Sequence, residues 1–296
     1  MRDMLAVSSA RLAAMHAHHV HRDPWPAFDR VDVSGVETAV RVHAMRQWAG
    51  RARNEYGSVH QFSALTHALA EARAPVTVIG ALARLQTDEA RHVELCAALA
   101  RAYAGPDDDA VLRSWPTPRA PWRDAPRVAA NGDVSRIHEW AAEAAIAACC
   151  IGETLSVPML EAIALVATEP TAADVARQIL RDEHLHATFG WELLGWLLPQ
   201  LDEPARGRVQ AALAPVLSGF EVSTCGTFTA AELAGTTLEV TAPGPGVANL
   251  GTLDARTYAA IFYATLEGEI FPRFVALGLD PQRAWAERPA RAAPSK

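Results

Sequence analysis

The sequence predicts an all-α protein built on a bundle of four long helices, with a long crossover between the second and third helices and additional C-terminal helices. Apolar residues make up 50% of the chain, alanine is abundant, and proline and glycine separate long helical blocks. Alanine favours helix because it loses no side-chain entropy there. A block of roughly thirty residues forms a helix of about 45 Å, and helices of that length are typical of bundles.

The first two helices are predicted to form a hairpin. The first runs from about Ser34 to Ala74, and Pro75 suits the first turn of the second. The second helix ends near Ala104, because Gly105 and Pro106 stop it.

The crossover runs from Gly105 to Asp133, where prolines prevent regular structure, and the remaining helices follow it. These are a third helix from about Val134 to Thr168, bent at Pro158, a fourth from about Thr171 to Leu198, and two further helices at Glu203 to Leu217 and Asp254 to Leu277. A loop from Gly235 to Gly251, with a short extended piece at Thr237 to Val240, joins the last two. We therefore expect an N-terminal tail (1–33), a bundle (34–198) and a helical extension packed on it (199–296).

Composition excludes several classes of protein. The net charge is −7 and no basic stripe is present, which argues against nucleic acid as a partner. The N-terminus lacks the apolar core of a secretory signal, and no stretch reaches about 18 uncharged apolar residues, the length that crosses a bilayer. The four cysteines form no C-x-x-C pair and are interpreted as reduced thiols. A cytoplasmic protein without a membrane partner is expected.

Two predicted helices carry the same polar interruption in an apolar seam. In the second helix Glu89 and His92 fall on the seam, and in the fourth helix Glu183 and His186 do so. An ionised carboxylate in a bundle core costs several kcal/mol unless it is paired or bound to a metal. Two such Glu-x-x-His interruptions therefore need a common explanation.

The other two long helices each add one glutamate to their seam, Glu55 in the first and Glu153 in the third. Serine stands three residues after each, at Ser58 and Ser156, where the partner helices have histidine, and Gly57 and Gly152 also leave room beside the glutamates. Four glutamates and two histidines in this arrangement are the ligand set of a dinuclear carboxylate site. The predicted metal ligands, which are also the predicted catalytic groups, are Glu55, Glu89, His92, Glu153, Glu183 and His186.

The two D-E-x-x-H segments, Asp88–His92 and Asp182–His186, together with the two single glutamates, resemble the ferritin-like di-iron carboxylate superfamily. That group includes rubrerythrin, ribonucleotide reductase small subunits and bacterial multicomponent monooxygenase hydroxylases. The resemblance spans about residues 55–186. It implies that Asp88 and Asp182 bind the metal-bound imidazoles, and such partners orient the ring and raise its basicity.

Mixed carboxylate and imidazole ligands suit iron or manganese. We expect two iron ions, with Mn/Fe and Mn/Mn as alternatives, and an O2-activating oxidase or oxygenase acting on a small organic substrate. The competing functions are a ferroxidase that handles iron and a manganese catalase. The sequence has no G-x-G-x-x-G or Cys-rich segment to hold a reductant, so an external reductase or ferredoxin, or the substrate, would supply electrons. A homodimer is also considered.

Small and apolar residues complete the expected site. Leu85, Ile179, Ile146 and Phe62 are expected to give it a dry lining, and Gly190 and Cys96 to leave a cavity for a substrate.

Several polar residues are expected to have no part in this site. The cluster His16, His18, His19 and His21 could bind a metal, but its poorly patterned surroundings favour a solvated tail. The glutamates that fall off the seams are expected to be solvated, namely Glu94, Glu139, Glu143 and Glu161.

Overall fold

The structure is a computed structural model that describes residues 9–21, 24–105, 124–233, 240–244 and 246–289. All regular structure in these ranges is helical and none of it is strand, which confirms the all-α prediction. The elements before the crossover are α1 (Ala10–Val20), η1 (Phe28–Arg30), α2 (Thr38–Glu71) and α3 (Val76–Tyr103). After it come α5 (Ser135–Ala145), η2 (Ile146–Glu153), α6 (Thr154–Val166), α7 (Pro170–Leu197), η3 (Leu198–Gln200), α8 (Glu203–Cys225), α9 (Ala230–Leu233), α10 (Ala255–Thr265), η4 (Leu266–Ile270), α11 (Phe271–Ala276) and α12 (Pro281–Glu287).

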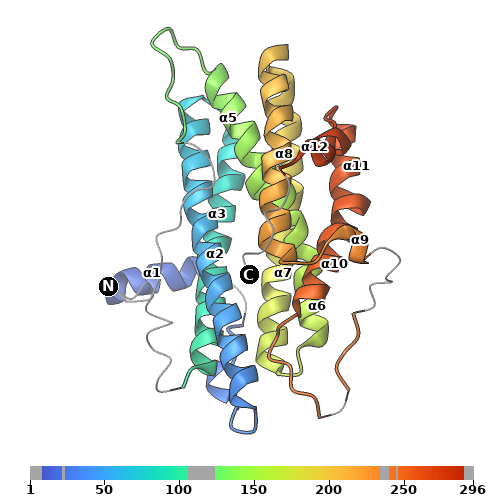
Figure 1. The fold of residues 1–296 in the computed structure, drawn as a ribbon. Coiled ribbons are helices and arrows are strands. Elements are labelled where there is room, and N and C mark those ends of the chain that lie inside the picture. The colour runs from blue at the N-terminus through green and yellow to red at the C-terminus, as the bar shows by residue number, and fades with distance from the viewer. Residues whose placement is uncertain (1–8, 22–23, 106–123, 234–239, 245, 290–296) are drawn as a thin grey trace.

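The long helices pack side by side (Figure 1). Helix α2 lies along α3, and the continuous segment formed by α5, η2 and α6 lies along α7. The two pairs meet where α3 contacts α7 and α2 contacts α5. Most of the predicted crossover, residues 106–123, lies outside the described residues. Four helical segments therefore surround one common interior.

The ends of these helices follow from local sequence. Pro75 is the N-cap of α3, one residue before the helix begins. At the start of α7, Pro170 occupies the first turn and the carboxylate of Glu169 accepts a hydrogen bond from the backbone N–H of Ala172 at 2.6 Å. The predicted limits of the four long helices agree with the structure within a few residues.

The third long segment departs from a regular α-helix. Its middle part, η2, is a π-helix that ends at Glu153, whereas Pro158 lies inside the following α6. We predicted a bend at Pro158 and did not predict the π-helical part. π-helical turns often occur at functional sites, and this one ends at Glu153, a candidate metal ligand.

The C-terminal part adds helices against the outer side of the long segments. Helix α8 packs on α10, α12 and α5, and α10 also contacts α6. Helix α8 extends eight residues beyond the predicted end at Leu217, to Cys225. Helices α9 and α12 were not predicted, and most of the extended piece expected at 237–240 lies outside the described residues.

The segment Ser135–Val166 is long and apolar enough to cross a membrane by length and composition alone. However, 61% of its most apolar window is buried inside the protein, as in the core helix of a soluble fold. The four cysteines, Cys96, Cys149, Cys150 and Cys225, are buried and none forms a disulfide.

Candidate metal centre

Six acidic and imidazole side chains from the four long segments converge in the interior. Two groups of four can be distinguished by proximity, and within each group the ligand atoms lie within 4.8 Å of one another. The first group is Glu55, Glu89, His92 and Glu183, and the second is Glu89, Glu153, Glu183 and His186. Glu89 and Glu183 belong to both groups, so two adjacent sets of possible ligands share two carboxylates.

Helix geometry brings these groups to the same depth. Glu55 comes from α2, and Glu153 is the last residue of η2. Glu89 and His92 of α3, like Glu183 and His186 of α7, are three residues apart and so share one helix face. All six side chains are buried, Glu55 being the most exposed at 8%.

Each shared glutamate approaches both imidazoles. The Nδ1 atom of His186 lies 3.1 Å from Oε1 of Glu89 and 3.6 Å from Oε2 of Glu183. The Nδ1 atom of His92 lies 3.6 Å from Oε1 of Glu183 and 3.8 Å from Oε2 of Glu89. Both rings therefore direct Nδ1 toward the centre, where a lone pair can bind a cation.

The opposite ring nitrogens face aspartates in a crossed pattern. Nε2 of His92 lies 3.3 Å from Oδ2 of Asp182, and Nε2 of His186 lies 3.5 Å from Oδ2 of Asp88. Each aspartate thus serves the histidine of the other D-E-x-x-H segment. An Nε2–H that donates to a carboxylate keeps Nδ1 unprotonated, which is the tautomer a ligand needs.

Two arginines that the sequence analysis did not single out hold these aspartates. Arg84 Nε donates to both oxygens of Asp88, at 2.9 and 2.7 Å, and Arg91 Nη1 donates to Oδ2 of Asp182 at 3.0 Å. Arg91 is 1% exposed and also donates to Oε1 of Gln178 at 2.6 Å. The sequence did contain a signal for this role, because Arg91 stands one residue before His92 and an arginine beside a buried seam needs a carboxylate partner.

Within the part of the chain that the structure describes, no arginine or lysine lies as close to these four glutamates as Arg84 and Arg91 lie to the two aspartates. Arg51 approaches Oε1 of Glu55 only to 3.8 Å. Both carboxylate oxygens of Glu89, one of Glu183 and the Nδ1 atoms of His92 and His186 are buried and make no hydrogen bond of regular geometry within the described residues. Such atoms are costly to bury without a partner. Two divalent cations would satisfy them and would offset the four carboxylate charges, so the residues fit a dinuclear site.

Burial has a large effect on the acidity of these groups. Removal from water raises the pKa of Glu89, Glu153 and Glu183 well above the usual range, and neighbouring carboxylates add to the shift. Burial alone would lower the pKa of His186, but the nearby carboxylates of Asp88, Glu89 and Glu183 raise it well above the ordinary value. Without a cation, the cluster therefore retains protons that a bound metal would displace.

A cleft of about 2270 Å³ reaches this cluster from one side. Its walls come from α2, from the α5–η2–α6 segment, from α8 and from the start of α10, and they include Glu55 and Glu153. The small residues expected beside these glutamates also line it, namely Gly57, Ser58, Gly152 and Ser156. Apolar side chains such as Met159, Ile163 and Phe220 alternate with polar ones such as Asn54 and Gln61.

The expectation that Gly190 and Cys96 open a substrate cavity is wrong. Gly190 packs directly against η2, where an added Cβ would lie 2.3 Å from Cβ of Cys149 and 2.9 Å from its carbonyl carbon. Cys96 is fully buried and, like Gly190, does not line the cleft. The open space beside the cluster instead lies on the side of Glu55 and Glu153. The four residues expected to give a dry lining, Leu85, Ile179, Ile146 and Phe62, are all buried.

Two of the glutamates expected to be solvated have side-chain partners from other helices or segments. Glu139 is 8% exposed and accepts two hydrogen bonds from Arg208, which lower its pKa. Glu94 is paired with two histidines. Glu143 is partly buried in the cleft wall, whereas Glu161 is exposed as predicted. The expectation was wrong for Glu94 and Glu139 because their partners come from other parts of the chain, which the pattern of a single helix does not reveal.

Comparison of this chain with protein-family models, with curated proteins and with solved structures gives no match. The functional interpretation therefore depends on the site itself.

Proposed function

We propose that this chain is a ferritin-like di-iron carboxylate protein that activates O2 as an oxidase or oxygenase of a small organic substrate. The observation that carries this proposal is the pair of overlapping ligand groups sharing Glu89 and Glu183 beneath an open cleft. One glutamate from each of two helices and Glu-x-x-His from each of the other two is the ligand pattern of ferritin-like bundles.

The choice of metal follows from the donor set. Four carboxylates and two imidazoles, with no thiolate, favour iron or manganese over copper or a structural zinc site. Glu55 with His92, and Glu153 with His186, would each help to hold one ion, while Glu89 and Glu183, which belong to both groups, would help to hold both. Two ferrous ions held there would supply electrons for the reduction of O2.

The cleft supports an organic substrate. Glu55 and Glu153, the two glutamates that belong to one ligand group each, form part of its wall together with both apolar and polar side chains. Specific small-molecule sites combine these features, an apolar wall with a few polar groups. In this proposal an external reductase or ferredoxin, or the substrate itself, provides electrons.

A ferroxidase is less favoured by the charge of the cleft. A route for Fe²⁺ would be lined by carboxylates, whereas here arginines accompany the acidic groups: Arg51, Arg53, Arg136 and Arg208 all line the cleft. Arg208 is bound to Glu139 there, which reduces the negative charge further.

Metal analysis tests the first half of the proposal. Protein purified from cells supplied with iron and manganese should contain two ions per chain. The variant Glu183→Ala should lose most of them, because Glu183 belongs to both groups of possible ligands. Glu161→Ala, which alters an exposed glutamate of α6, is the matched control and should keep both ions. A Glu183→Ala variant with parental metal content would remove Glu183 from the ligand set.

Reaction with O2 tests the second half. Anaerobic ferrous protein is mixed with O2, a reduced ferredoxin and candidate organic substrates, and products are identified by mass. We expect an oxidised organic product and O2 consumption that depends on the substrate. Turnover of added Fe²⁺ with mineral growth and no organic product would establish a ferroxidase instead. Rapid disproportionation of H2O2 by a manganese-loaded form would establish a catalase.

A further inference from the structure

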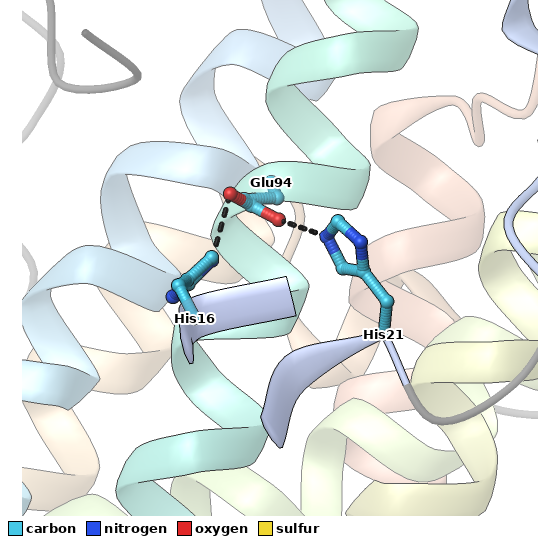
Figure 2. Close-up of side chains that lie close together, drawn as sticks. All are labelled: His16, His21 and Glu94. Carbon is cyan, nitrogen blue, oxygen red and sulfur yellow. Dashed lines mark hydrogen bonds and ion pairs between the residues drawn. The ribbon is translucent and has the colours of Figure 1, made fainter. Parts of the chain in front are cut away.

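A second group of possible ligands lies outside the central cluster, where α1 crosses α3 (Figures 1 and 2). Nε2 of His16 lies 2.8 Å from Oε1 of Glu94, and Nε2 of His21 lies 2.7 Å from Oε2 of the same carboxylate. Figure 2 shows the two imidazoles approaching Glu94 from opposite sides. The terminus that we expected to be a solvated tail thus contains a helix attached to α3.

The two histidines converge because α1 ends between them. Residues five apart in a continuous α-helix point about 140° away from each other. Helix α1 stops at Val20, and His21 leaves it with φ −87° and ψ 62°. This turn of the backbone brings the His21 ring back toward Glu94, with its centroid 6.0 Å from that of His16. Stacking on Trp25, at a centroid distance of 4.0 Å, holds the ring on its other side.

The group is separate from the central cluster and accessible to solvent. Glu94 follows His92 by two residues on α3, so the two side chains point to different faces of the helix. Side-chain exposures are 40% for His16, 34% for His21 and 24% for Glu94. An ion could therefore reach these residues from solution.

We propose that His16, His21 and Glu94 form a binding site for a divalent transition-metal ion that fastens α1 to α3. One ligand atom from each residue lies within 4.8 Å of the others, as three ligands of one ion require. Two neutral imidazoles and one carboxylate favour Zn²⁺ and similar ions over Mg²⁺ or Ca²⁺, which prefer oxygen ligands. Water would occupy the remaining coordination positions.

The remaining attachment of α1 is slight, which gives the ion a structural effect. Val20 is the buried residue of α1, while Leu12 and Met15 are each 54% exposed. Few buried contacts mean a low local free energy of opening. An ion that binds only the docked arrangement would shift α1 toward that arrangement by mass action.

Equilibrium dialysis against Zn²⁺, with protein whose central cluster is already loaded with iron, tests the site. The parent should bind one Zn²⁺ more per chain than the double variant His16→Ala, His21→Ala, and Glu94→Gln should show the same loss. The double variant His18→Ala, His19→Ala is the matched control, since it removes two histidines from the same helix, and it should bind Zn²⁺ as the parent does. Mg²⁺ in place of Zn²⁺ should show no difference among these proteins.

Trypsin cleavage after Arg11 in α1 gives a second readout, independent of metal counting. Zn²⁺ should slow this cleavage in the parent and in the control variant but not in the His16→Ala, His21→Ala variant. Equal Zn²⁺ binding by the parent and that variant would overturn the proposal, and the two histidines would then only hydrogen-bond to Glu94. An equal loss of bound Zn²⁺ in the control variant would also overturn the proposal, because any surface histidines would then bind Zn²⁺ equally well.

Discussion

Asp88 and Asp182 illustrate how single residues prepare the candidate centre without belonging to either ligand group. Each contacts one histidine from the opposite D-E-x-x-H segment and at least one arginine. The arginine compensates the buried carboxylate, and the carboxylate fixes the tautomer of the imidazole. Asp182 has a lowered pKa despite burial, because it accepts hydrogen bonds from His92 and is close to Arg91. It therefore remains an anion near neutral pH.

Asp88→Asn and Asp182→Asn should each weaken metal binding or slow reaction with O2 by about 10- to 100-fold, because an amide orients the imidazole less firmly and raises its basicity less. The fold should persist, since the side chains have the same shape. Competition with a metal chelator measures the affinity. Asp174→Asn, on the same helix as Asp182, is the control, since Asp174 is exposed and pairs only locally with Arg177. Parental metal affinity together with parental kinetics of the reaction with O2, in both test variants, would refute the role assigned to the aspartates.

At the level of elements, the close approach of α7 to η2 determines where Glu153 lies. Gly190 of α7 allows this approach, since any side chain there would enter the space of Cys149. At Gly195, on the same helix, an added Cβ would lie 3.5 Å from Leu277 Cδ2, which is an ordinary van der Waals contact. The two glycines therefore form a natural pair for comparison.

Gly190→Ala should lower the free energy of unfolding by about 1–3 kcal/mol, because the methyl group forces apart two packed backbones. Gly195→Ala should leave it unchanged or raise it by up to about 1 kcal/mol, since alanine favours helix over glycine. Chemical denaturation of the metal-free proteins measures both values. Equal stability of the two variants would show that the contact at Gly190 is looser than described.

Long helices with clear apolar seams could be predicted from sequence, and so could the position of Glu55, Glu89, Glu153 and Glu183 on those seams. The π-helical segment could not, because its apolar pattern is equally that of an α-helix; in the structure it packs against Gly190 of another helix. Arg84 and Arg91 were missed because their carboxylate partners include residues on another helix. The docking of α1 depends on Glu94, which no pattern within residues 10–20 reveals.

For the molecule as a whole, bound metal should change how stability depends on pH. The raised pKa values of Glu89, Glu153 and Glu183 mean that the folded metal-free protein retains protons that the unfolded chain releases above about pH 4.3. Its free energy of unfolding should therefore fall as the pH rises from there through the raised values. His186 acts in the same direction, because its raised pKa stabilises the fold at low pH and this contribution is lost as the pH rises.

Metal binding needs ionised carboxylates and neutral imidazoles, so the stabilisation by metal should grow as the pH rises. We expect the increase in Tm on adding Fe²⁺ under anaerobic conditions to be larger at about pH 8 than at about pH 5.5. Thermal unfolding with metal and with a chelator at each pH measures this increase. The variant Glu183→Ala should lose most of the effect. An increase in Tm that is the same at both pH values would contradict the proton-linked ligand set.

The cleft offers a test that separates chemistry on an organic substrate from handling of iron. Gly219 of α8 lines the cleft, and an added Cβ would meet no atom within 4 Å, so Gly219→Trp should fold and narrow the space. Gly207 of the same helix is equally open but does not line the cleft, so Gly207→Trp is the matched control.

An indole ring in the cleft should reduce turnover of an organic substrate by about tenfold or more, the effect of roughly 1.4 kcal/mol, without altering metal content. Oxidation of added iron should change little, because the substitution alters none of the proposed metal ligands. Product mass and iron oxidation are measured for both variants and the parent. Equal organic turnover in Gly219→Trp and Gly207→Trp would place the substrate outside this cleft.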